Sequence, residues 1–242
     1  MPIVAWFSGR GAFGPDNGTL SGRYPTLIVA AGYAFAIWGP IFLLDLVFGF
    51  WQAFAAKPRD GDAIRRIAPA SALGFALTAA WMIVFPMQMF VVALVVIWLD
   101  MACMLYCADV LASERQRSAA LTWAALLPLS LHAGWLALAA FLNLAQVIVA
   151  YRLLSTTDML AWSLVLLAAA VLLLLAWNGR MRGNLPFAFA GVWGLAGVYV
   201  RQSGSDLAGA GTVAIMAVVA AVVLVAQALW LLARRAPEAR PG

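Results

Sequence analysis

The sequence predicts an all-α, polytopic membrane helix bundle with about seven transmembrane helices. Of the 242 residues, 65% are hydrophobic and only 10% are charged, whereas about a quarter of residues are charged in soluble globular domains. The apolar runs are continuous, and each reaches the roughly 20 residues that a helix needs to cross the hydrocarbon core of a bilayer. A transmembrane β-barrel would instead alternate apolar and polar residues. The first predicted partner is therefore the lipid bilayer.

The elements follow from the apolar runs and the polar stretches between them. Residues 1–24 contain several glycines, and we expect this segment either to lie on the surface or to be loose. The first long run carries Trp38, Gly39 and Pro40 near its middle, so we expect a helix that is interrupted there and leaves room beside Trp38. Ser155 to Asp158 offer an N-cap for the fifth helix. The predicted helices cover residues 25–56, 67–87, 89–112, 119–151, 158–178, 185–202 and 207–233.

The basic residues predict the orientation of this bundle. Eleven of the 15 Lys and Arg residues fall in the connections after the first, third and fifth helices and in the C-terminal tail, and four fall on the other side. Cytoplasmic connections carry an excess of Lys and Arg, so the N-terminus is predicted outside and the C-terminus in the cytoplasm. The net charge of +5 is thus a feature of membrane topology and gives no indication of nucleic-acid binding.

Three ionisable side chains lie inside predicted spans, namely Asp45, Asp100 and His132, the only histidine of the chain. Such residues are costly in a membrane and normally face protein or a water-filled cavity. One interpretation is a polar cluster that binds a ligand or passes a proton, as in a small transporter. The other is a set of interhelical hydrogen bonds that fix the packing. The sequence leaves both open.

The chain also contains eleven tryptophans, several of them near the middle of predicted spans. Aromatic walls with few polar groups suit a flat apolar ligand, although simple packing is the alternative for each residue. A retinal-binding protein needs a buried lysine, and the single lysine, Lys57, lies in a connection. Bis-histidine haem ligation needs two histidines. Because no nucleotide-binding or hydrolase motif occurs and Cys103 and Cys107 read as ordinary helix residues, we predict a non-enzymatic protein without a metal.

Four segments in order resemble the tryptophan-rich sensory protein (TspO/MBR, translocator protein) family, most closely its longer bacterial relatives. The first segment runs from Arg23 to Gly39, beginning with Arg-Tyr-Pro-Thr-Leu and ending with Ala-Ile-Trp-Gly. The overlapping pattern Trp38-Gly-Pro-Ile-Phe is similar to an aromatic pattern of the family's second helix. Leu77 to Phe85 is similar to the third helix, without its asparagine and first tryptophan. Pro128 to Asn143 contains a Pro-x-Ser-x-x-x-Gly-Trp lead-in and the family's Trp-to-Asn spacing of eight residues.

The resemblance implies a TspO-like core of four helices at 25–152, with three additional helices and a short tail at 153–242. It implies an inner-membrane protein of bacteria that binds a tetrapyrrole-like ligand in a sensory, regulatory or transport role. The implied ligand-binding residues are Trp38, Trp81, Trp135 and Asn143. We add His132 as a fifth predicted ligand-binding residue, because it lies one helical turn from Trp135 on the same side. The alternative is an accessory subunit of a larger, pigment-containing membrane complex. A homodimer or a membrane-protein partner is compatible with either function.

Overall fold

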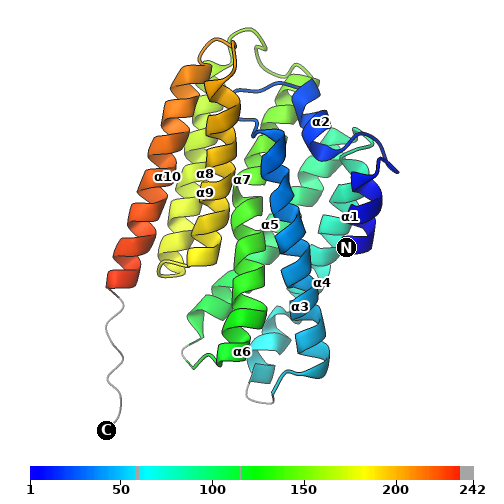
Figure 1. Cartoon of the computed structure of the whole chain (residues 1–242), viewed down its shortest axis with the longest axis vertical. Helices are drawn as coiled ribbons and strands as arrows, with labels where there is room; N and C mark the ends of the chain where they lie inside the picture. Colours follow the sequence, from blue (N-terminus) through cyan, green and yellow to red (C-terminus); the bar gives the residue numbers. More distant parts are fainter. Residues whose placement is uncertain (58–59, 115, 235–242) are drawn as a thin grey trace.

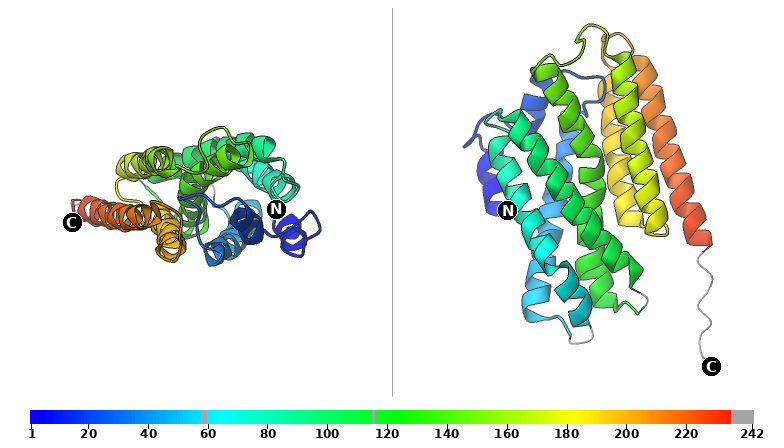
Figure 2. Two further views of the ribbon diagram at one scale, coloured as in Figure 1. Left: turned by 90° about the horizontal axis from the view of Figure 1, so that it is seen from above. Right: turned by 180° about the vertical axis from the view of Figure 1, so that it is seen from behind.

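The helices run alternately up and down through one elongated bundle (Figures 1 and 2). The computed structural model describes residues 1–57, 60–114 and 116–234. The long helices are α3 (Trp38–Phe54), α4 (Gly61–Val84), α5 (Phe90–Ser113), α7 (Leu127–Ala150), α8 (Leu160–Arg180), α9 (Leu185–Ser203) and α10 (Ala210–Ala233). The short ones are α1 (Pro2–Gly9), α2 (Asn17–Arg23), the 3₁₀ helix η1 (Gly32–Ile37), α6 (Ala119–Leu121) and the π-helical turn η3 (Thr122–Leu126). The all-α prediction is confirmed.

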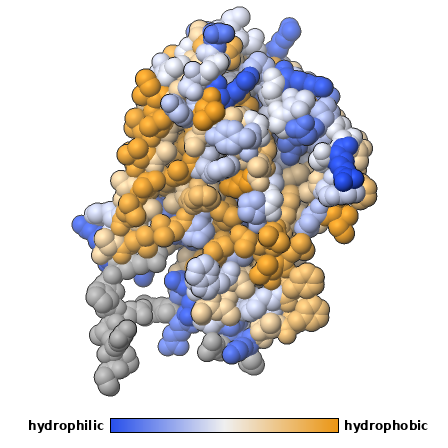
Figure 3. Space-filling model, viewed as in Figure 1, coloured by the Kyte–Doolittle hydropathy of each residue, from blue (hydrophilic) through white to orange (hydrophobic). Residues whose placement is uncertain are grey.

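Six helical segments of the described residues are long and apolar enough to cross a membrane. They correspond to the first five and the last of the predicted spans. Helix α9, expected as the sixth, does not meet the same apolar criterion, although it runs beside α7 and α10 along the bundle. The count of seven spans therefore stays a prediction. Apolar side chains cover the outer face of α10 (Figure 3), as expected of a surface that meets lipid.

Helix α7 is the central element of the bundle. In its most apolar window, 83% of the residues are buried, against 22% in α8 and in α10. It packs on α5, α9, α8 and α3, and Gly134 lets the backbone of Phe187 in α9 approach, since a Cβ atom there would lie 2.3 Å from the Phe187 carbonyl oxygen. Pro128 follows the π-helical turn η3, and such a turn accommodates a proline that cannot donate its hydrogen bond. Residues 119–150 thus form one continuous span, as predicted.

The first predicted span differs from the expectation. Residues 25–31 are not helical, η1 follows them, and the α-helix begins only at Trp38. Pro40 therefore lies in the first turn of α3, where a proline has no hydrogen bond to break. Gly39 and Pro40 are exposed on the outer face of the bundle while Trp38 is buried, so these two residues do not open space beside Trp38 as predicted.

Helix α9 provides the hydrogen bonds that the non-helical segment needs. The Ala31 amide donates to the Gly197 carbonyl over 2.9 Å, and the Gln202 side chain donates to the carbonyl groups of Thr26 and Val29. Irregular backbone at membrane depth is tolerated where protein surrounds it and satisfies its polar groups. The indole of Trp193 continues this contact by donating to the Ala34 carbonyl over 2.9 Å. Segment 25–31 is thus held inside the bundle.

The N-terminal residues are more ordered than expected. Helix α1 packs against α4, and α2 packs against η1 at the top of the bundle (Figure 1). Asp16 caps α2 by accepting from the amides of Gly18 and Thr19, and the hydrogen bonds from Thr19 lower the pKa of this carboxyl group. Leu20 is completely buried. The segment lies on the surface, which was one of the two expectations, but it is not loose, because Leu20 anchors it.

Two other helix starts differ from the predictions. Helix α4 begins at Gly61, six residues earlier than expected. The negative charge of Asp62 in its first turn interacts favourably with the positive end of the helix dipole. Helix α8 begins after Met159, whose side chain makes no cap. The Ser155 hydroxyl instead accepts from the Asp158 amide over 2.9 Å within the preceding turn, so Ser155–Asp158 does not cap the helix. Helix α5 lies within a residue of its predicted bounds.

Candidate functional site

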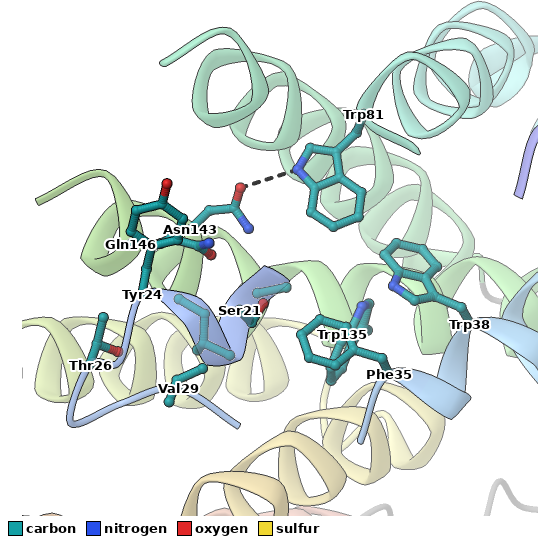
Figure 4. Close-up of a pocket in the computed structure, with 12 residues that line it drawn as sticks. Ser21, Tyr24, Thr26, Val29, Phe35, Trp38, Trp81, Trp135, Asn143 and Gln146 are labelled. Carbon is teal, nitrogen blue, oxygen red and sulfur yellow. Dashed lines mark hydrogen bonds between the residues drawn. The ribbon is translucent and has the colours of Figure 1, made fainter. Parts of the chain in front are cut away.

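Three tryptophans from three helices surround a cavity in the upper half of the bundle (Figure 4). Trp38 comes from α3, Trp81 from α4 and Trp135 from α7, and Asn143 lies two turns above Trp135. These are four of the five residues predicted to bind a ligand, and the fifth, His132, is not among the residues that line the cavity. The remaining lining residues are Ser21, Tyr24, Thr26, Val29, Phe35, Ala139, Leu142 and Gln146. The structure thus brings the four predicted residues to one place.

The indole rings form a continuous aromatic cluster. Trp38 lies 6.0 Å from Trp81 and 6.1 Å from Trp135 between ring centroids, and Phe35 contacts the far side of Trp135 edge-on at 6.0 Å. Trp81 also stacks on Phe85 at 4.5 Å. Because the rings fill the space between them, the cavity has a volume of only about 20 Å³, enough for roughly one water molecule.

The polar atoms around this cavity are incompletely paired. The indole N–H of Trp81 donates to Asn143 Oδ1 over 3.2 Å. The indole N–H groups of Trp38 and Trp135 and the amide nitrogen of Gln146 are buried and have no hydrogen-bond partner among the described residues. Buried polar groups are normally hydrogen-bonded, and leaving one unpaired costs about 1–3 kcal/mol. The wall therefore offers hydrogen-bond donors to a molecule with acceptor groups.

The N-terminal part of the chain closes the cavity from above. Ser21 lies in α2, and Tyr24, Thr26 and Val29 follow in the non-helical segment. The Tyr24 hydroxyl donates to Gln88 Oε1 over 3.0 Å, which ties the cover to the α4–α5 connection. This cover was not predicted from the sequence, because residues 1–24 were assigned to the surface. Phe35 and Gln146 were not predicted either, because no sequence motif around them indicates a binding site.

The ionisable residues of the predicted spans form a second cluster, directly below the aromatic one. His132 Nδ1 of α7 lies 2.9 Å from Asp45 Oδ2 of α3. On the opposite side of the ring, His132 Nε2 lies 3.4 Å from the Thr78 hydroxyl of α4. That hydroxyl is 2.6 Å from Asp100 Oδ2 of α5. The chain Asp45–His132–Thr78–Asp100 therefore crosses four helices, and we call it the polar relay.

All four residues of the polar relay are at most 3% exposed, so the prediction that Asp100 faces the bundle interior is confirmed. Thr78 was not predicted, since an isolated threonine in an apolar helix is ordinary. The available signal was its place three residues before Trp81, on the same helix face. His132 does not line the cavity. It lies below Trp38, whose ring meets the imidazole edge-on at 5.6 Å.

These features define a class of protein: a multi-pass α-helical membrane protein with a buried aromatic cluster above a buried polar one. A family model described as TSPO-like protein matches residues 2–230. The chain therefore belongs to the TSPO-like protein family, and the match extends well beyond the four segments in which the resemblance was found. Comparison with curated proteins and with solved structures gives no match.

Proposed function

We propose that this protein binds a planar, apolar ligand of the tetrapyrrole class between α3, α4 and α7, in a non-enzymatic sensory, regulatory or transport role. The observation that carries the proposal is the combination of three tryptophans around one cavity with the unpaired donors of Trp38, Trp135 and Gln146. Indole faces provide stacking and burial for a macrocycle. The free N–H groups of Trp38 and Trp135 and the Gln146 amide would meet polar atoms at its edge.

Binding requires the cavity to enlarge. Pockets for ligands of this size measure roughly 300–1,000 Å³, whereas the cavity measures about 20 Å³. The part of the cover that can move is residues 21–24, since it belongs to no long helix and the Tyr24–Gln88 hydrogen bond that fastens it is exposed, whereas Thr26 and Val29 are held by the Gln202 side chain. We therefore propose that the ligand enters beneath this cover and separates the indole rings.

We also propose that the protein lies in the inner membrane of a bacterium, with its N-terminus outside and its C-terminus in the cytoplasm. In that orientation α2, which belongs to the cover, lies toward the outer side (Figure 1), and so does the cavity that the cover helps to line. The aromatic pocket would then receive a ligand from the outer leaflet or from the space beyond it.

Titration with a soluble porphyrin in detergent tests the binding proposal through quenching of tryptophan fluorescence. Trp38→Phe and Trp135→Phe keep an aromatic ring but remove the indole N–H, and we expect each to weaken binding about tenfold, or 1.4 kcal/mol. Matched Trp→Phe changes at Trp177 and Trp230, near helix ends outside the cavity, should leave affinity unchanged.

Equal losses at all four positions would indicate general destabilisation rather than a pocket. Absence of porphyrin binding by the unmodified protein would refute the proposal and favour an accessory subunit of a larger complex. Such a subunit should copurify with stoichiometric partners from its native membrane.

A further inference from the structure

We propose that the polar relay is an intramembrane proton-binding site, in which one mobile proton is shared between Asp45 and Asp100 through His132 and Thr78. This site is separate from the aromatic cavity, and its role does not depend on which ligand that cavity takes. The inference rests on the order of the four groups, on their burial and on a groove that reaches one end of the relay.

The hydrogen-bond inventory of the relay is the first argument. The Thr78 hydroxyl has one proton and three acceptors within reach: the Gly74 carbonyl at 3.1 Å, Asp100 Oδ2 at 2.6 Å and His132 Nε2 at 3.4 Å. If Asp100 carries a proton, it donates to Thr78 and leaves the threonine proton free for the imidazole. If Asp100 is ionised, the threonine proton must turn toward it. The protonation state of Asp100 thus determines whether the Thr78 hydroxyl donates a hydrogen bond to His132 Nε2.

The same order of groups allows a balanced transfer. Asp100 gives its proton to the Thr78 oxygen, Thr78 gives its own proton to His132 Nε2, and the Nδ1 proton of His132 passes to Asp45 Oδ2. The products are an Asp100 carboxylate, a neutral Asp45, an intact threonine and the other neutral tautomer of the imidazole. The His132–Asp45 contact has hydrogen-bond length without hydrogen-bond alignment, so a small ring rotation completes the path.

Packing alone does not account for this cluster. Interhelical hydrogen bonds need only neutral polar groups, whereas an ionisable residue near the bilayer centre costs about 2.5–3.5 kcal/mol on insertion scales. Two carboxyl groups are present, and Asp45 Oδ1 and Asp100 Oδ1 have no hydrogen-bond partner among the described residues. Sharing one proton between two such carboxyl groups removes one of the two buried charges.

One end of the relay lies beside an open groove, and the two carboxyl oxygens of Asp45 are buried next to it. Asp45 lines an open groove of about 360 Å³ together with Gly49, Gln52 and Phe75, bordered by the start of α1. Helix α1 carries no ionisable side chain. Met1, whose α-amino group is titratable, lines the same groove as Asp45. On the Asp100 side the neighbouring titratable groups are Cys103 on α5 and Cys107 one turn beyond. No basic side chain therefore neutralises Asp45 apart from His132.

Because His132 is the only histidine, ¹⁵N-histidine labelling of the full chain in lipid nanodiscs reports on this site alone. We expect the Nε2 resonance to follow one titration between about pH 4 and 9, as Asp100 loses its proton and Thr78 turns away from the ring. Asp100→Asn and Thr78→Val should abolish this titration. Thr78→Ser, which keeps the hydroxyl, should preserve it.

Asp109→Asn is the matched control, because Asp109 lies on the same helix but pairs with Arg180 outside the relay. It should leave the titration unchanged. A pH-independent Nε2 resonance in the unmodified protein would overturn the proposal. So would a titration that survives in folded Thr78→Val, since the effect of Asp100 would then not pass through the hydroxyl. Comparison of Thr78→Val with Thr78→Ser tests the proposal even if Asp100→Asn does not fold.

Discussion

At the scale of single residues, each of three helices supplies one aromatic and one polar side chain to the interior. Thr78 and Trp81 are three residues apart on α4, and so are His132 and Trp135 on α7, so each pair shares a helix face. The edge contact between Trp38 and His132 joins the two layers. The aromatic cavity and the polar relay are therefore stacked by helix geometry, and a change in one layer reaches the other through direct contact.

Gly134 allows a residue-scale test of the packing that holds both layers. A Cβ atom there would lie 2.3 Å from the Phe187 carbonyl oxygen, so Gly134→Ala must push α9 away from α7. Overpacking of this kind costs about 1–3 kcal/mol, and we expect a lower midpoint of thermal unfolding in detergent. Gly211→Ala, where nothing lies within 4 Å, should slightly raise the midpoint by helix propensity. Equal midpoints for the two variants would contradict the close crossing.

Much of the interior could be predicted at this scale, for a physical reason. Charged groups in an apolar run cannot face lipid cheaply, so the burial of Asp45, Asp100 and His132 followed from their types alone. Thr78 could not be identified in this way, because a hydroxyl group satisfies itself on its own helix backbone at little cost. Its role depends on distances to α5 and α7 that sequence spacing does not give.

At the scale of elements, the start of the first span was mispredicted because hydropathy does not distinguish helical from extended apolar backbone. Segment 25–31 is as apolar as a helix, but its hydrogen bonds go to α9. The Gln202 side chain reaches the Thr26 carbonyl 176 residues away in the chain. Local propensity carries no information about such a partner, whereas α5 and α9, which satisfy their own backbone, were predicted within a residue or two.

The tie between α9 and this segment can be tested by Gln202→Leu. The change leaves the Thr26 and Val29 carbonyl groups without their donor, and each unpaired buried group costs about 1–3 kcal/mol. We expect faster hydrogen exchange at the Ala31 amide, which bonds to Gly197. Gln227→Leu removes a comparable tie between α10 and α8 and should leave Ala31 unchanged. Equal exchange at Ala31 in all three proteins would show that Gln202 does not hold the segment.

At the scale of the whole molecule, the described basic residues separate between the two ends of the bundle. The α3–α4 connection, the α5–α7 connection and the α8–α9 turn all face downward in Figure 1. Together with the adjoining helix ends they carry six of the eleven described basic side chains, namely Lys57, Arg65, Arg66, Arg117, Arg180 and Arg182. Arg180 joins α8 to α5 there through two 2.8 Å contacts with Asp109. Arg59, Arg115 and the tail from residue 235, which belong to the same charge count, lie outside the described residues.

This asymmetry predicts that the lower end faces the cytoplasm, because basic connections are retained there during insertion. A single cysteine at Gly61, with Cys103 and Cys107 replaced, should resist an impermeant thiol reagent in intact cells and react after permeabilisation. A single cysteine at Thr157, in the exposed α7–α8 connection at the opposite end, should react in intact cells. The reverse labelling pattern would overturn the orientation and place the cover of the aromatic cavity on the cytoplasmic side. The ligand would then have to come from inside the cell.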